Sequence, residues 1–292
     1  MGLPPLLQTL DRWMKSSPWH PRVTPFFVYI LGLALTGLLT PENRLGAWAY
    51  LPLYAGVCGL IAWLLWRYRA LVPELTLRFH WTVLPSAALL LVAWVALGHG
   101  YNRLFGVEDA AVPLAEAEVF GPLAAASAAG FWAAFVARGV GMTLVVPLFE
   151  ELFVRSAVLR AVHSWRGTRT GLLQFAADLP AVGELVADRP AVEDAQREPP
   201  AFTRQLERTP LGAVTLFSAL ASTAVFAASH GARDWAGCLA CGLVWCWMVR
   251  HTNRPSLPPQ RRAGLGPVVW SHALVNLGLW VWTLRTGDWQ FL

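Results

Sequence analysis

Three short clusters of polar residues interrupt otherwise apolar stretches of the 292-residue chain. An ionisable side chain inside an apolar helix is costly, so its presence there indicates a function. The three clusters hold Glu150, Glu151 and Arg155; Phe226 and His230; and His272 and Asn276.

Helical spacing predicts different roles for these residues. Glu151 and Arg155 are four residues apart with the acid first, which is the favourable direction for an ion pair along a helix. Glu150 is rotated by about 100° from Glu151, so the same arginine is less able to satisfy it. We therefore expect Arg155 to hold Glu151 and leave Glu150 for chemistry. His272 and Asn276 are also four residues apart and share one helix face.

These groups are the ones that hydrolysis of a peptide bond requires. Glu150 can take a proton from water and return it to a leaving amine. His272 and Asn276 can polarise the scissile carbonyl and stabilise the developing oxyanion. His230 can orient the water, and Phe226, one turn earlier, can shield the imidazole from lipid.

A metal-assisted reaction is an open alternative. His230, His272 and Glu150 could together hold a divalent metal such as zinc and leave one position free. The sequence has no H-E-x-x-H motif of a zincin and no G-x-S-x-G nucleophile elbow. It also offers no membrane aspartate dyad, because Asp234 and Asp288 lie at the edges of apolar runs.

Composition indicates that most of the chain lies in a bilayer. Apolar residues make up 55% and charged residues 14%, against about 25% charged in an average soluble domain. The net charge of +5 lies mostly between apolar runs, which does not favour nucleic-acid binding. No pattern at the N-terminus is typical of a cleaved signal peptide. The other polar candidates have ordinary readings: His99 and His163 as interfacial residues, Arg138 as a packing residue, and the cysteines as small apolar residues.

A membrane-spanning helix needs about 20 apolar residues. The candidate spans are 26–40, 47–66, 81–97, 211–229, 234–249 and 267–284, and the longer stretch 122–162 forms either one crossing or two. Basic loops favour the cytoplasmic side. One crossing through 122–162 puts the basic loops 11–25, 67–80 and 250–266 on one side.

The sequence therefore predicts an all-α polytopic membrane helix bundle of about seven spans (seven to eight) around a polar cavity, with a cytoplasmic N-terminus. Residues 1–121 form N-terminal spans and loops, and 122–284 form the catalytic core. Within the core, residues 164–210 are a polar, partly helical cytoplasmic insert. Residues 285–292 form a C-terminal tail.

The ordered motifs E-E-x-x-x-R, F-x-x-x-H and H-x-x-x-N resemble those of the CPBP family of intramembrane endopeptidases, which includes type II CAAX prenyl proteases and bacteriocin-processing proteins. The resemblance covers about 122–284. It implies Glu150, His230, His272 and Asn276 as catalytic residues, with Glu151 and Arg155 supporting them. In that family the mechanism is argued both as glutamate-activated water and as a metalloprotease.

The full layout is also similar to a bacterial branch found with exosortase-type sorting systems. The similar features are Glu74 with Arg78, the lead-in to Pro147, and the segment from Gly287 to Phe291. The resemblance implies a bacterial cytoplasmic membrane protein that acts on a lipidated or membrane-anchored protein. The alternatives are a proton-coupled transporter and a catalytically silent scaffold or immunity protein.

Overall fold

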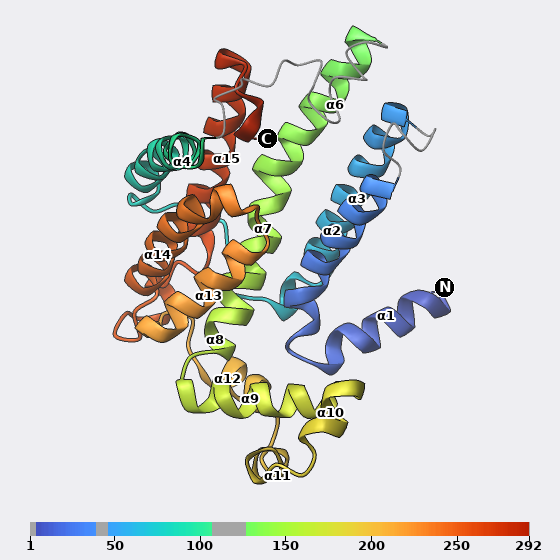
Figure 1. The fold of residues 1–292 in the computed structure, drawn as a ribbon, viewed down its shortest axis with the longest axis vertical. Helices are drawn as coiled ribbons and strands as arrows, with labels where there is room; N and C mark the ends of the chain where they lie inside the picture. Colours follow the sequence, from blue (N-terminus) through green and yellow to red (C-terminus); the bar gives the residue numbers. More distant parts are fainter. Residues whose placement is uncertain (1–3, 39–45, 107–126, 292) are drawn as a thin grey trace.

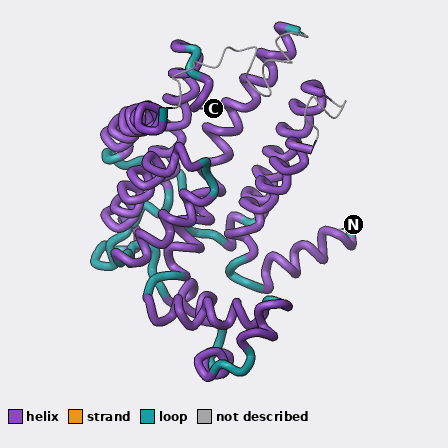
Figure 2. Tube along the Cα trace, in the orientation of Figure 1, coloured by secondary structure: helices purple, strands orange, loops and turns teal. Residues whose placement is uncertain are grey.

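The computed structural model describes residues 4–38, 46–106 and 127–291, and the regular elements in these ranges are all helical (Figure 1, Figure 2). No β-strand occurs within them. The all-α class predicted from the sequence is therefore confirmed.

The N-terminal helices are α1 (Pro5–Ser16), α2 (His20–Leu38), α3 (Gly46–Arg67), the short η2 (Arg69–Leu71) and α4 (Val83–Phe105). One unbroken helical rod follows, made of α6 (Ala128–Val140), η4 (Gly141–Val145), α7 (Val146–Glu151), η5 (Leu152–Val158) and α8 (Leu159–Ala161). The next helices are α9 (Trp165–Asp178), α10 (Pro180–Val186), α11 (Pro190–Arg197) and α12 (Ala201–Arg208). The last are α13 (Leu216–Ala228), η6 (Ala232–Asp234), α14 (Trp235–Thr252), η7 (Pro259–Arg261), α15 (Gly266–Thr286) and η8 (Trp289–Phe291).

Three helical segments of the described chain are long and apolar enough to cross a membrane: Val83–Phe105, Ala128–Ala161 and Pro259–Thr286. Two shorter apolar helices, Leu51–Arg67 and Leu216–Ala228, accompany them. These segments support a membrane-embedded helical bundle, and the number of seven crossings stays a prediction.

The rod from Ala128 to Ala161 runs through the middle of the bundle (Figure 1). Helices α2 and α3 lie on one side of it, and α4, α13, α14 and α15 lie on the other. Its 34 residues rise about 1.5 Å each, giving a length of about 50 Å against a hydrocarbon core of about 30 Å. A single rod therefore fits the one-crossing interpretation of 122–162, with one end projecting.

The predicted span 211–229 is too long at its start. Helix α13 begins only at Leu216, where the Thr215 hydroxyl accepts the backbone N–H of Ser218 at 3.0 Å in a capping box. Before it, Gly212 packs so closely that a Cβ would lie 1.9 Å from the carbonyl oxygen of Asn253. Residues 211–212 form a turn instead of helix, packed closely against the backbone of Asn253.

The helix that includes the predicted span 26–40 starts before it. Helix α2 already starts at His20 and carries Pro25 inside it. Proline is tolerated near a helix start, where backbone N–H groups have no helical acceptor, so Pro21 does not delay the helix. Residues 39–40 lie outside the described residues.

The insert 164–210 is helical for most of its length. Gln174 of α9 joins its helices, because Nε2 donates to the Ala195 carbonyl at 2.8 Å and Oε1 accepts the Ala201 N–H at 2.9 Å. Gln205 of α12 then donates to the Ala161 carbonyl at 2.5 Å. The insert is thus a small packed unit attached to the end of the rod.

A partly buried acid, Glu74, in the loop before α4 joins several helices. Arg22 of α2 donates to both carboxylate oxygens of Glu74, at 2.7 and 3.1 Å. The Ser156 hydroxyl donates to the same carboxylate, and Arg160 lies 3.4 Å from it. The Glu74 carbonyl accepts the Leu265 N–H at 2.8 Å, at the start of α15. One residue therefore links α2, the rod and α15.

Burial raises the pKa of the Glu74 carboxyl, but the hydrogen bonds and charge of Arg22 and the Ser156 hydroxyl outweigh it, so the pKa lies below the ordinary value of 4.5. A lowered pKa in the folded state means that the unfolded state binds the proton more tightly. The stabilisation is therefore present above the ordinary pKa and is lost as pH falls below it.

We expect Glu74→Gln to destabilise the fold, because it leaves Arg22 buried without its carboxylate. Breaking a buried ion pair costs about 3–5 kcal/mol of unfolding free energy. Thermal unfolding in detergent micelles measures the effect, and the variant should also lose less stability than wild type as the pH falls from about 5 to about 3. Glu193→Gln, in an exposed pair with Arg197, is the matched control and should change little. Equal unfolding temperatures for both variants would contradict this role of Glu74.

Candidate active site

Two π-helical turns, η4 and η5, flank the acidic pair of the rod. In the first, Val146 donates to the carbonyl of Gly141, five residues back. Pro147 follows, and its ring nitrogen has no hydrogen to donate to the Met142 carbonyl. That carbonyl accepts Nδ2 of Asn276 at 2.8 Å. The proline therefore helps the rod to receive a side chain from α15.

The Glu151 carboxylate is fully buried and contacts a basic group on each side. Its Oε1 lies 2.9 Å from Nδ1 of His272. Its Oε2 lies 3.4 Å from Nε of Arg155, one turn along the rod. Glu151 is thus shared between Arg155 of its own helix and the imidazole of α15. The helical spacing predicts the first partner, and it does not predict the second.

Aromatic rings surround the equally buried Arg155 guanidinium. Among the described residues, its side-chain nitrogens have no hydrogen-bond partner. The guanidinium carbon lies 5.3 Å from the ring centre of Phe226 and 5.7 Å from that of Trp245. Cation–π attraction is strongest when the cation is desolvated, as it is here. The charge is therefore held by Glu151 and two ring faces.

The imidazole of His272 is oriented from two sides. Its ring stacks on Trp245, with centroids 4.4 Å apart and an interplanar angle of 24°. Trp245 is itself fixed by its Nε1, which donates to the Ser271 hydroxyl at 3.1 Å. A carboxylate only accepts, so Nδ1 of His272 donates to Glu151. The other nitrogen, Nε2, lies 3.8 Å from Oε2 of Glu150.

His230 lies just beyond the end of α13 and is partly exposed. Its Nδ1 lies 2.9 Å from the Phe226 carbonyl, which can only accept, so Nδ1 carries the hydrogen. This tautomer leaves Nε2 as an acceptor. The ring also meets the Phe226 ring edge-on at 4.7 Å, and Trp94 of α4 flanks it at 6.1 Å.

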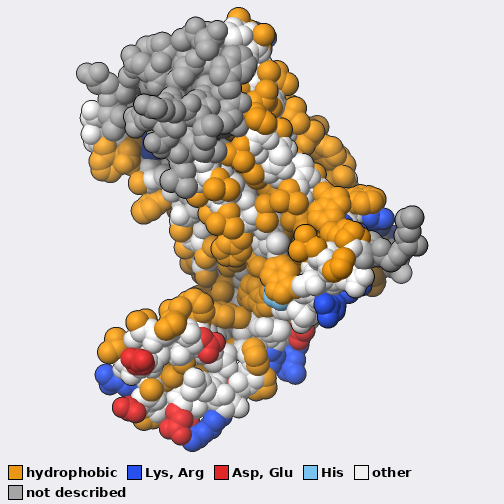
Figure 3. Space-filling view, turned by 90° about the vertical axis from the view of Figure 1, so that its right-hand side faces the viewer, with side chains coloured by type: hydrophobic (Ala, Val, Ile, Leu, Met, Phe, Trp, Pro, Cys, Tyr) orange, Lys and Arg blue, Asp and Glu red, His pale blue; other side chains and the backbone are white. Residues whose placement is uncertain are grey.

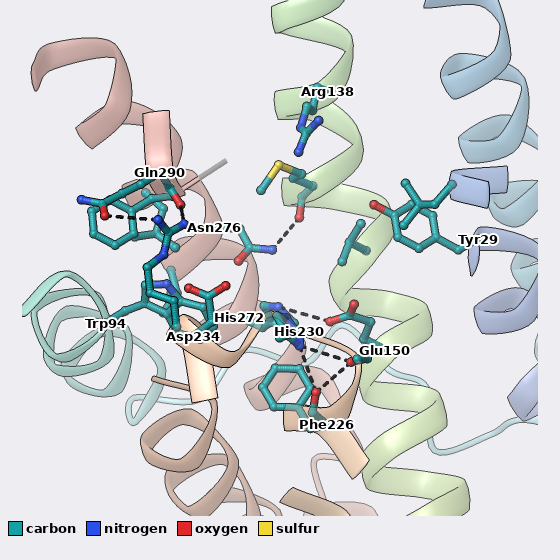
Figure 4. A pocket seen from close by; sticks show the side chains of 18 of the residues that line it. Tyr29, Trp94, Arg138, Glu150, Phe226, His230, Asp234, His272, Asn276 and Gln290 are labelled. Atoms are coloured by element: carbon teal, nitrogen blue, oxygen red, sulfur yellow. Dashed lines mark hydrogen bonds and ion pairs between the residues drawn. The ribbon is translucent and has the colours of Figure 1, made fainter. Parts of the chain in front are cut away.

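One cavity of about 320 Å³ collects the candidate residues of all three clusters (Figure 4). Its lining includes Glu150, Phe226, His230, His272 and Asn276. Glu151 and Arg155 lie behind this wall, because both are fully buried and neither lines the cavity.

A second polar group lines the same cavity. Arg138 of α6, Arg233 and Asp234 of η6, and Gln290 of η8 lie along its wall (Figure 4). Arg233 donates to the Gln290 carbonyl at 2.5 Å, and Asn102 of α4 donates to its Oε1 at 2.7 Å. The C-terminal tail is therefore part of the cavity wall.

The arrangement does not fit a resident metal. Across residues 4–38, 46–106 and 127–291, no group of three His, Cys, Asp or Glu side chains is placed to hold a metal ion. The set proposed from the sequence, His230, His272 and Glu150, shares the cavity without forming such a group.

Sequence reasoning missed the groups that orient the candidate residues. Trp245 stands among cysteines in an apolar run, where nothing in the spacing connects it with His272. For the Met142 carbonyl the sequence holds one weak indication: the proline five residues later cannot donate a hydrogen bond to it. Gln290 and Asp234 belong to segments that the sequence interpretation left outside the site.

The comparisons with known proteins add no relative: no family model, no curated protein and no solved structure matches the chain. The resemblance to the CPBP family therefore stays a prediction based on the three motifs.

The buried pair allows a test by double-mutant cycle. Glu151→Gln leaves Arg155 as a buried, unpaired charge and should destabilise the protein by about 3–5 kcal/mol. Adding Arg155→Met removes that charge, so the double variant should be more stable than Glu151→Gln alone. Thermal unfolding in detergent micelles provides the measurement. Simple additivity of the two losses would show that the residues do not interact.

Proposed function

We propose that the chain is an intramembrane endopeptidase that hydrolyses a peptide bond close to the membrane, near the C-terminus of a lipid-modified or membrane-anchored protein. The observation that supports this most is the convergence of Glu150, His230, His272 and Asn276 on one cavity. They come from the rod, from the end of α13 and from α15, and together they supply a base, two imidazoles and an amide.

The proposal includes the membrane setting and the family. The chain would cross the bacterial cytoplasmic membrane seven times with its N-terminus inside, and the insert would be cytoplasmic. Its three motifs resemble those of the CPBP family, and its layout is similar to that of the exosortase-associated branch. On that resemblance, the substrate is a CAAX-type or sorting-signal protein.

The chemistry follows from the positions of the side chains. Glu150 takes a proton from a water that His230 orients through Nε2, and the resulting hydroxide attacks the scissile carbonyl carbon. Negative charge builds on the carbonyl oxygen. Asn276 Nδ2, held by the Met142 carbonyl, donates its second hydrogen to this oxygen. His272 adds a second donor only in its protonated form, in which Nε2 also carries a hydrogen. The C–N bond then breaks as Glu150 returns the proton to the leaving amine.

The position of His272 depends on Glu151 and Trp245, which both touch its ring. Glu151 fixes Nδ1, and Trp245 fixes the plane of the ring. Both are positioning residues, since each acts through His272. Backbone access is a separate requirement, because a helical substrate must unwind locally before its carbonyl can be attacked.

Proteolysis in liposomes tests the proposal. The purified chain is reconstituted with a panel of prenylated and C-terminally anchored peptides, and products are detected by mass spectrometry. We expect cleavage by wild type and a loss of about 10²–10⁴-fold in Glu150→Ala, which lacks the general base. Glu193→Gln, on the exposed face of α11, is the matched control and should cleave as wild type does.

A chelator arm separates the two mechanisms. Cleavage that survives chelation supports a glutamate-activated water, whereas loss on chelation would contradict it. Full cleavage by Glu150→Ala, or no cleavage of any peptide by wild type, would contradict the endopeptidase proposal and favour the carrier or scaffold alternatives.

Trp245 provides a test of positioning. Trp245→Ala removes the ring that stacks on His272, and a small misplacement of a catalytic group can cost about 10²-fold in rate. We expect kcat to fall by about this factor with KM little changed. Trp245→Phe keeps a ring in place and should recover most of the rate. Equal losses in both variants would indicate a general packing defect.

A further inference from the structure

The insert exposes a row of large hydrophobic side chains. On α9, Trp165, Leu172 and Phe175 are 63%, 52% and 57% exposed, and on α10 Leu185 is 79% exposed. The members on α9 recur at intervals of three and seven residues, so they share one helix face. Single exposed apolar residues are ordinary, but a contiguous stripe marks a binding surface.

The exposed row borders the side of α9 that packs inside the insert. Thr168 and Gly171 are buried. Gly171 lies against the ring of Phe202 in α12, with a Cβ placed only 2.8 Å from it. Gln174 binds backbone groups after α11 and at the start of α12. The stripe is therefore not needed to hold α9 in the insert.

The stripe is continuous with the apolar outer surface of the bundle. The Trp165 ring meets Phe217 edge-on, with centroids 5.4 Å apart. Phe217 lies in the first turn of the apolar helix α13, beside the exposed Leu216 and Leu220. Figure 3 shows hydrophobic side chains along the edge of the insert that faces the bundle, and charged ones gathered below.

Helix α1 repeats this pattern at the same end of the bundle. It lies crosswise to α2 and α3 (Figure 1) and exposes Leu6 and Trp13, seven residues apart, while Met14 on its other side is buried. A basic residue accompanies each apolar row. Arg169 lies one turn from both Trp165 and Leu172 on α9, and Lys15 lies in the last turn of α1.

We propose that the insert lies on the membrane that the bundle spans, with the α9–α10 stripe in the boundary between headgroups and acyl chains and Arg169 beside the phosphates of anionic lipids. Amphipathic helices with a basic rim bind lipid surfaces in this way. The bilayer is the occupant that these observations favour, because the stripe continues a surface that already faces lipid.

A depth-sensitive label tests this inference in the full-length protein. Leu172→Cys or Leu185→Cys is labelled with an environment-sensitive fluorophore, and Asp194→Cys on the charged α11 is the matched control. The native cysteines Cys58, Cys238, Cys241 and Cys246 are buried, so labelling is directed to the new site.

The protein is placed in nanodiscs of phosphatidylcholine and phosphatidylglycerol that carry a nitroxide on the upper acyl chain. We expect loss of fluorescence at positions 172 and 185 and none at 194. Nanodiscs without phosphatidylglycerol should quench the labels at 172 and 185 less when Arg169 is present. The same change of lipid should have no effect when the labelled protein also carries Arg169→Gln, because that variant lacks the headgroup contact. Equal fluorescence at all positions would overturn the inference. So would a label shielded from water but not quenched by lipid, which would indicate a second copy or another protein on the stripe.

Discussion

The site depends on one buried carboxylate. Glu151 has no access to solvent and faces Arg155 within the rod and His272 from α15. A buried charge is costly unless it is paired, and the imidazole that α15 brings to the rod is a second partner for this carboxylate beside Arg155. The same contact fixes the histidine that faces Glu150. The contact between Glu151 and His272 therefore both joins α15 to the rod and orients a candidate catalytic side chain.

A π-helical turn in the rod allows α15 to contact it. In a regular α-helix the Met142 carbonyl would accept the Val146 N–H. The wide turn before Pro147 gives that N–H to Gly141, and Met142 accepts Asn276 instead. The aromatic wall formed by Phe226 and Trp245 then covers Arg155, so that the cation keeps a low-dielectric surround. Away from the site, Glu74 links the same rod to α2 and to the start of α15.

Local patterns allowed the sequence to predict the all-α class, the long rod and the Glu151–Arg155 pair, since each depends on neighbours along one helix. Contacts between distant segments could not be predicted in this way. The stacking of Trp245 on His272 and the approach of Gln290 to the cavity depend on how helices pack. Two helices begin away from the starts of the predicted spans: α13 at Leu216, after a capping threonine, and α2 at His20, ahead of the apolar run.

The proposed function requires a cavity that is complementary to the transition state of peptide hydrolysis rather than to a transported ion. The most direct measurement is the affinity of a membrane-anchored peptide whose scissile carbonyl is replaced by a hydrated difluoroketone, which imitates the tetrahedral intermediate. The account predicts that wild type binds this analogue more tightly than the parent peptide and that Asn276→Ala loses the difference. Equal affinity of wild type for analogue and parent would contradict it.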